Sequence, residues 1–94
     1  MKLVVKLRAA ATIGKIGRWV EEQNTDGSGE RWVNKVYDYF EDIARVGLKL
    51  TLCKNEDLAR QNFSCFTYNS KWVIAYRIKG DELIIYRFIW GAFL

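Results

Sequence analysis

The sequence predicts an α+β domain in two layers, with a helical hairpin packed on an antiparallel sheet. Its 94 residues are enough for one hydrophobic core and too few for two, so residues 1–94 are expected to form a single domain. Apolar residues recur at helical spacing in the first half of the chain and at strand spacing in the second half. The predicted order is therefore β-α-α-β-β-β(-β), with a meander of three or four strands.

Residues 2–7 are predicted to form a short strand, because β-prone leucines and valines stand between two lysines. From Ala9 to about Gln23 the apolar spacing is that of one helical face. Gly14 and Gly17 lie inside this helix, where each costs about 1 kcal/mol relative to alanine. Glycines three residues apart let a second backbone come close, so we expect this helix to pack against a neighbour.

Residues 24–29 are a loop by composition, and either Asp26 or Ser28 is expected to cap the helix that follows. This second helix is predicted to end at Gly47. Its apolar stripe consists of Trp32 or Val33, Val36, Phe40 and Ile43.

The rest of the chain is predicted to be the meander. Residues 48–53 alternate leucine with polar or small residues, which indicates a half-buried strand, and residues 54–62 are polar enough for a loop or one helical turn. Strands are then expected at 63–68, 72–78 and 82–90. The connections at 69–71 and 79–81 are short hairpin turns, and Gly80 supplies a positive φ in the second one.

The composition excludes common enzyme classes. The sequence has no histidine, which removes the usual general base, the base of a Ser-His-Asp triad and the commonest metal ligand. We therefore expect no metal and no cofactor. The net charge of +4 is mildly basic and favours an acidic partner or a polyanion.

The two cysteines and the absence of long apolar runs bear on the cellular compartment in which the protein is expected. Cys53 and Cys65 lie in apolar runs, and two thiolates without histidine cannot complete a zinc site. We expect small buried thiols in a reducing compartment rather than a disulfide. No apolar stretch approaches the roughly 18 residues of a membrane span, so a soluble, cytoplasmic protein without membrane contact is predicted.

Three segments of the chain form a combination that is known from one group of proteins. The chain has a first strand KLVVKL, then Arg-Ala opening a helical hairpin, then the C-terminal hairpin WVIAYRIKGDELIIYRFIWG. The most specific features are in this last hairpin: Trp72, Tyr76-Arg77, Gly80-Asp81, the apolar run 83–89 and Trp90-Gly91. Together these segments resemble the RelE/ParE superfamily, the toxins of bacterial type II toxin–antitoxin modules. The resemblance covers essentially the whole chain and implies the same α+β fold.

The superfamily has two branches that differ in target. RelE-like members cut mRNA on the ribosome and carry two lysines, two arginines and a tyrosine at defined places, whereas ParE-like members inhibit DNA gyrase. Aligned on Tyr76, the two lysine positions hold Ser64 and Phe66, and the first arginine position holds Val73. The chain ends Gly91-Ala-Phe-Leu, without an arginine–tyrosine pair. The resemblance thus implies a ParE-like toxin that is not an enzyme, although the basic tail of many ParE-like chains is replaced by an apolar one.

The partner implied by the resemblance is a cognate antitoxin, in a module of the plasmid-stabilisation kind, with DNA gyrase as inferred target. Family antitoxins wrap the toxin with a segment that folds on binding, and an acidic segment would complement the +4 charge. A homodimer or a heterotetramer with the antitoxin is compatible with this. We expect an apolar groove between hairpin and sheet, and the candidate contact residues are Trp19, Trp32, Trp72, Arg77, Arg87, Trp90, Phe93 and Leu94.

Two alternatives remain open. One is a ribosome-dependent mRNA endoribonuclease with a rearranged catalytic set, Lys71, Arg77, Tyr86 and Arg87. The other is an inactive family member that retains only antitoxin binding. At the level of single residues, core or sheet-face packing is the commoner explanation for Trp72 and Trp90. Arg77 and Arg87 are equally explained as solvated strand residues or as partners of Asp81 or Glu82.

Overall fold

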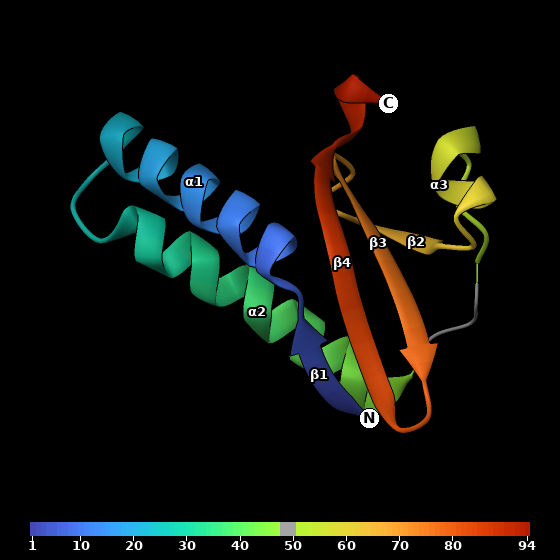
Figure 1. Cartoon of the computed structure of the whole chain (residues 1–94). Coiled ribbons are helices and arrows are strands. Elements are labelled where there is room, and N and C mark those ends of the chain that lie inside the picture. Colours follow the sequence, from blue (N-terminus) through green and yellow to red (C-terminus); the bar gives the residue numbers. More distant parts are fainter. Residues whose placement is uncertain (48–50) are drawn as a thin grey trace.

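The computed structural model describes residues 1–47 and 51–94, which form a four-stranded sheet with two long helices on one face (Figure 1). The elements are β1 (Lys2–Val5), α1 (Leu7–Gln23), α2 (Ser28–Val46), α3 (Glu56–Arg60), β2 (Ser64–Tyr68), β3 (Trp72–Lys79), β4 (Glu82–Trp90) and a final 3₁₀ turn η1 (Gly91–Phe93). The predicted α+β class and element order are confirmed. In the part of the chain that is described, no helix is long and apolar enough to cross a membrane.

The sheet has the strand order β1-β4-β3-β2. Strands β2, β3 and β4 form the predicted antiparallel meander, and β1 adds a parallel strand beside β4, with Val5 opposite Ile85. The first strand ends at Val5 rather than at residue 7, because Leu7 already begins α1 and is 84% exposed. The β3–β4 turn contains Gly80 at φ 60°, as predicted.

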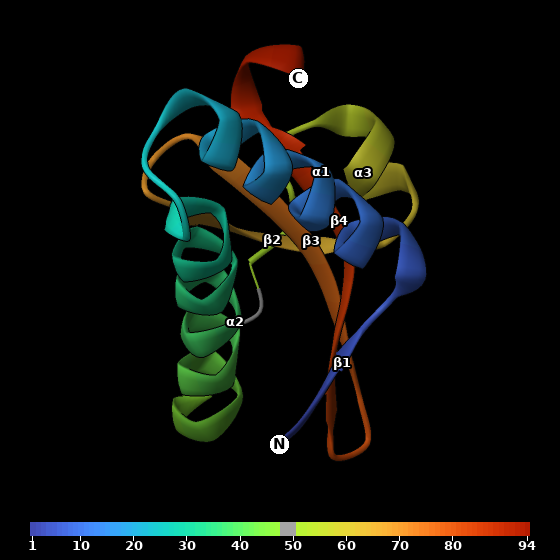
Figure 2. The ribbon, with the colours of Figure 1, turned by 90° about the vertical axis from the view of Figure 1, so that its left-hand side faces the viewer.

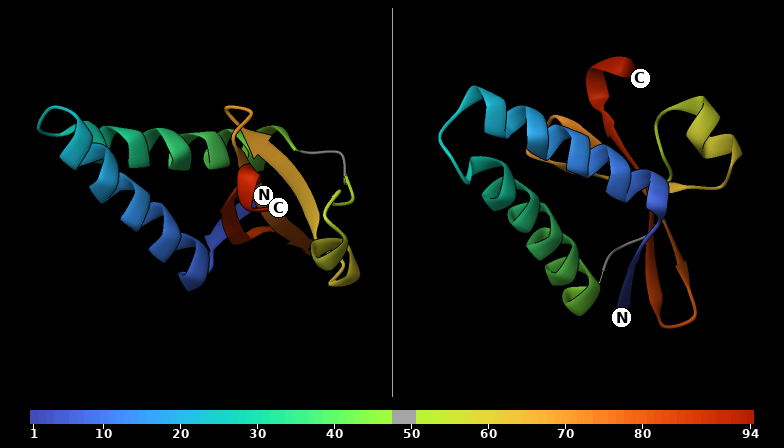
Figure 3. Two further views of the ribbon diagram at one scale, coloured as in Figure 1. Left: turned by 90° about the horizontal axis from the view of Figure 1, so that it is seen from above. Right: turned by 60° about the vertical axis from the view of Figure 1, so that its left-hand side comes forward.

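The helices α1 and α2 form the predicted hairpin, which is closed at its turn and opens toward the sheet (Figure 3). The two helices come close together at Gly17 and Gly29, where a Cβ on Gly29 would lie 2.2 Å from the Gly17 carbonyl oxygen. The expected close approach is thus confirmed at Gly17, whereas Gly14 has only the Arg18 side chain near it. Seen from the helix side, α1 crosses in front of β4 (Figure 2).

The cap of α2 differs from the prediction of Asp26 or Ser28. Gly27 occupies the N-cap position at φ 84°, a left-handed conformation that favours glycine. The Glu21 carboxylate of α1 accepts hydrogen bonds from the backbone N–H groups of Gly27, at 2.7 Å, and of Gly29, at 2.8 Å. These bonds hold the pKa of Glu21 below its ordinary value.

The main core lies between the hairpin and the inner face of the sheet, and the predicted stripe of α2 belongs to it. Val36 and Phe40 are fully buried, and the Phe40 ring meets Phe66 and Phe88 at 6.4 and 6.3 Å between centroids. The buried members of this core are Ala9, Ile13, Val36, Phe40, Ile43, Ala44, Ile74, Tyr76, Leu83, Ile85 and Phe88.

The segment before β2 departs from the sequence prediction in two ways. Of the strand predicted at 48–53, residues 48–50 lie outside the described part, and Leu52 makes a single antiparallel bridge to Ser64. Cys53 and Cys65 form a disulfide, so the expectation of two free thiols is wrong. The bridge explains this pairing, because it brings the two backbones together and leaves the cysteine Cα atoms 4.8 Å apart.

Candidate functional site

The face of the sheet opposite the hairpin, here called the outer face, carries a short helix and several polar side chains. α3 lies on this side, away from α1 and α2 (Figure 1). A β-bulge shapes the surface: pairing passes from Ala75–Arg87 to Tyr76–Ile85, which leaves Tyr86 as the extra residue of β4. A bulge bends its strand and redirects side chains, so Tyr86 and its neighbour Arg87 both point to the outer face.

Four basic side chains, here called the cationic cluster, lie at and around the Tyr86–Arg87 bulge: Lys6, Arg8, Arg77 and Arg87. The Lys6 ammonium is 5.8 Å and the Arg77 guanidinium carbon 5.0 Å from the centre of the Tyr86 ring. Burial, together with the nearby charge of Arg8, lowers the pKa of the Arg87 guanidinium. Within residues 1–47 and 51–94, no carboxylate forms a salt bridge with any of the four.

Backbone pairing fixes this cluster in place. The N–H of Lys6 donates to the Ile85 carbonyl at 2.8 Å, so the end of β1 and the first turn of α1 lie beside the bulge. On the other flank, the Arg77 guanidinium lies 4.2 Å from the Phe63 ring centre and donates a hydrogen bond to the Gln61 carbonyl. The cluster is therefore held between α1 and the segment that carries α3, and its charges stay close together.

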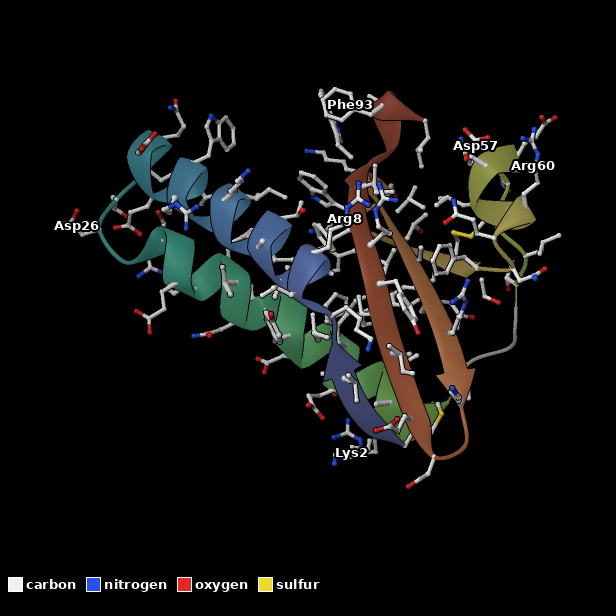
Figure 4. The ribbon with its side chains drawn as sticks, in the orientation of Figure 1. Lys2, Arg8, Asp26, Asp57, Arg60 and Phe93 are labelled. Carbon is white, nitrogen blue, oxygen red and sulfur yellow. A yellow bond between two sulfur atoms is a disulfide. The ribbon has the colours of Figure 1, made fainter. Side chains whose placement is uncertain are left out.

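Two hollows border α3, which forms a wall of both. The first hollow, of about 650 Å³, is the more apolar and includes Leu52, Cys65 and Val73. The second, of about 540 Å³, includes Arg87 and Ile89. Phe93 on the C-terminal turn and Asp57 and Arg60 on α3 lie at the same end of the sheet (Figure 4). The residues common to both hollows are Asn55, Leu58 and Leu94.

A smaller apolar cluster supports α3 on this face. Leu58 and Phe63 are buried against Ala75 of β3, and Tyr86 and Ile89 of β4 pack at its margin. This cluster is separate from the main core on the other side of the sheet. The outer face therefore combines charge, partial apolar cover and open hollows, which is the composition of a binding surface.

The structure brings together three of the four residues of the alternative catalytic set. Arg77, Tyr86 and Arg87 all belong to the outer face. Lys71 is exposed in the β2–β3 turn, where its carbonyl accepts a hydrogen bond from the N–H of Gly91. A catalytic set with all four residues at one point is therefore not assembled.

The aromatic residues expected to contact a partner divide into two groups. Trp32 and Trp72 pack edge to face at 6.1 Å and both contact Phe88, so they fill the space between hairpin and sheet where a groove was expected. Trp19 is 61% exposed on α1, away from the outer face.

The C-terminal residues form an exposed apolar patch. The rings of Trp90 and Phe93 meet at 5.1 Å, and Phe93 is 77% exposed. Leu94 extends the patch into both hollows.

Sequence reasoning counted Lys6 and Arg8 among scattered solvated basic residues and did not group them with Arg77 and Arg87. They join the site because β1 pairs with β4 in parallel. The repeat of lysine before the first helix gave no sign of this pairing. It also missed the disulfide, for which the presence of two cysteines flanking a polar, loop-like segment was the available signal.

Comparison with known proteins gives the fold. No family model matches the sequence, and no curated protein matches it either. A solved structure described as the chromosomal ParDE toxin–antitoxin system from P. aeruginosa superposes with a TM-score of 0.73. The match covers 96% of this chain and 95% of the other chain, at 17% sequence identity. The chain is thus similar to that structure in fold over essentially its whole length.

Proposed function

We propose that this chain is the toxin of a ParDE-type toxin–antitoxin module, that it inhibits DNA gyrase and that a cognate antitoxin neutralises it. The observation that carries the proposal is the fold likeness to a ParDE system over 96% of the chain. The C-terminal hairpin, with Tyr76-Arg77 and Gly80-Asp81, supports it from the sequence side.

The chemistry of the outer face favours binding over RNA cleavage. Attack by a ribose 2′-hydroxyl needs a base, a proton donor and cations at the phosphate. At the positions where RelE-like nucleases carry lysines, Ser64 is engaged in the bridge to Leu52 and Phe66 packs against Tyr76 of the main core. The arginine position holds Val73, which lines the first hollow.

The surface also suits the expected antitoxin. An acidic segment would neutralise the cationic cluster, whose charges have no carboxylate partners among the described residues. Apolar residues of the same segment would fill the first hollow and cover Phe93 and Leu94, which are 77% and 48% exposed. A single antitoxin segment that covers the cationic cluster and these apolar residues together would therefore neutralise the toxin.

A supercoiling assay tests the target. Purified chain added to DNA gyrase and relaxed plasmid should reduce supercoiling, and Arg87→Gln should need about tenfold more protein for the same effect. Arg45→Gln is the matched control, because Arg45 is an exposed arginine of α2 that pairs with Asp42, far from the outer face. Unimpaired supercoiling at high toxin excess would refute the gyrase target.

The gathering of Arg77, Tyr86 and Arg87 favours a ribosome-dependent endoribonuclease as the second candidate function. In that case Tyr86 and the arginines would act on a scissile phosphate without Lys71. End-labelled mRNA incubated with ribosomes and the purified chain would be cut, and Tyr86→Phe would abolish the cut. Intact mRNA together with inhibited gyrase would eliminate this candidate.

A further inference from the structure

The disulfide closes a loop that contains all of α3. Cys53 follows the bridge from Leu52 to Ser64, and Cys65 is the second residue of β2. Backbone bonds run beside it, from the Cys65 N–H to the Thr51 carbonyl at 2.9 Å and from the Cys53 N–H to the Phe63 carbonyl at 3.4 Å. The sulfur bridge therefore fastens both ends of the α3 segment at one point (Figure 4).

Apart from this bridge, the α3 segment is weakly attached. A helix of five residues is not stable alone in water. Its salt bridges from Arg60 to Glu56 and to Asp57 are 3.6 Å long, fully local and at least 73% exposed, so they add little. Leu58 and Phe63, together with the bond from Arg77 to the Gln61 carbonyl, are its main contacts with the sheet.

The rest of the domain does not depend on this segment. The main core lies on the other face of the sheet and includes no residue of α3. Local opening of a loosely attached unit can therefore occur while the core stays folded. The α3 segment also forms the wall that the two hollows share, through Asn55 and Leu58.

We infer that the Cys53–Cys65 disulfide is a site of thiol–disulfide exchange with a dithiol reductant, and that its reduction releases α3 from the outer face. Cys65 lines the first hollow and is the more exposed of the two, while Cys53 is only 4% exposed. We expect a small thiol to approach the Cys65 sulfur through this hollow. The inference concerns this chain alone and holds whatever its cellular target is.

The exchange proceeds in two balanced steps. A thiolate of the reductant attacks the Cys65 sulfur, forming a mixed disulfide, and Cys53 leaves as a thiolate. The second thiol of the reductant, as its thiolate, then attacks its own sulfur in the mixed disulfide, and Cys65 leaves as a thiolate. Two electrons have passed to the protein, solvent protons neutralise both cysteine thiolates, and the reductant ends as a disulfide.

Release of α3 would change the binding surface. Arg77 would lose the Gln61 carbonyl and the Phe63 ring, so its guanidinium would be free to join an anionic ligand. The shared wall of the two hollows would move away from the sheet. The oxidised and reduced proteins would thus present two different outer faces to a partner.

Hydrogen–deuterium exchange of the full chain, measured by mass spectrometry with and without dithiothreitol, tests the inference. Reduction should accelerate exchange at residues 55–65 by about tenfold or more, with α1, α2 and β3 unchanged. The double variant Cys53→Ser/Cys65→Ser should exchange at the rate of the reduced protein, and dithiothreitol should not change that rate.

Three outcomes would overturn it. Equal exchange at 55–65 in the oxidised and reduced wild-type protein would show that the disulfide does not hold α3. Loss of protection throughout the chain would show that the disulfide stabilises the whole fold and not the α3 segment alone. Alkylation of both cysteines in air-oxidised protein would show that no disulfide forms.

Discussion

The two faces of the sheet are built in different ways. The inner face meets the hairpin through a continuous core in which Ile13, Val36, Phe40 and Ile74 are completely buried. Among the described residues, the outer face has the small apolar cluster around Leu58 and Phe63. The α3 segment covers this cluster, and the Cys53–Cys65 disulfide joins the two ends of that segment. Cations and hollows occupy the remaining area.

This difference separates stability from function. Apolar burial on the inner face supplies most of the favourable free energy of folding. The outer face leaves Arg87 beside Arg8, and within residues 1–47 and 51–94 neither forms a salt bridge with a carboxylate, an arrangement that stability alone does not favour. We therefore propose that the inner face supplies the stability of the fold and the outer face the recognition of partners. Three perturbations can break or sharpen this division.

The largest expected effect is on the inner face. Phe40→Ala should lower the free energy of unfolding by about 4 kcal/mol, because it removes a fully buried ring that contacts Phe66 and Phe88. Phe63→Ala is the matched outer-face variant, since Phe63 is 6% exposed but belongs to the small cluster. We expect it to cost about 2 kcal/mol, because the loop can collapse around the gap. Urea unfolding followed by circular dichroism measures both, and an equal or larger loss for Phe63→Ala would contradict the division.

A smaller effect is expected within the hairpin. Gly29→Ala would place a Cβ 2.2 Å from the Gly17 carbonyl oxygen, so the helices must separate at a cost of about 2–3 kcal/mol. Gly14→Ala is the control, because only the flexible Arg18 side chain is near, and it should be neutral or stabilise by up to about 1 kcal/mol. Thermal unfolding distinguishes the two, and similar melting temperatures for both variants would disprove the close approach.

The smallest effect is electrostatic and appears only in acid. The folded state lowers the pKa of Glu21 through the N–H groups of Gly27 and Gly29, so this carboxylate stabilises the fold above its unfolded pKa of about 4.3. The contribution is lost as the pH falls through the lower, folded pKa. Glu21→Gln should therefore make the urea midpoint fall less between pH 6 and pH 3, a range that includes the pKa of a free carboxyl group. Glu22→Gln is the control and should leave this fall unchanged. An unchanged pH profile for Glu21→Gln would show that the cap contributes nothing.

The extent to which these features followed from the sequence depends on the range of the interaction. The stripe of α2, the meander strands and the glycine turn at Gly80 depend on local patterns, and all were predicted. The cap of α2 was not, because Glu21 acts from another helix, and the disulfide depends on the single bridge from Leu52.

The candidate site shows the same limit. Arg77 and Arg87 were expected at corresponding places on neighbouring strands, but the register places Arg77 opposite Ile84 and Arg87 opposite Ala75. Lys6 and Arg8 join them through the parallel pairing of β1 with β4, which no local pattern specifies. The bulge that turns Tyr86 and Arg87 to one face is likewise a feature of strand pairing.

Growth inhibition on induced expression tests the central claim, that the outer face carries recognition, most directly. The comparison is between Arg87→Gln, on the outer face, and Arg45→Gln, on α2, with both proteins checked for equal expression and equal melting temperature. We predict that wild type and Arg45→Gln stop growth equally, and that Arg87→Gln restores viable counts by about tenfold or more. Full toxicity of a folded Arg87→Gln protein would contradict the assignment of recognition to this face.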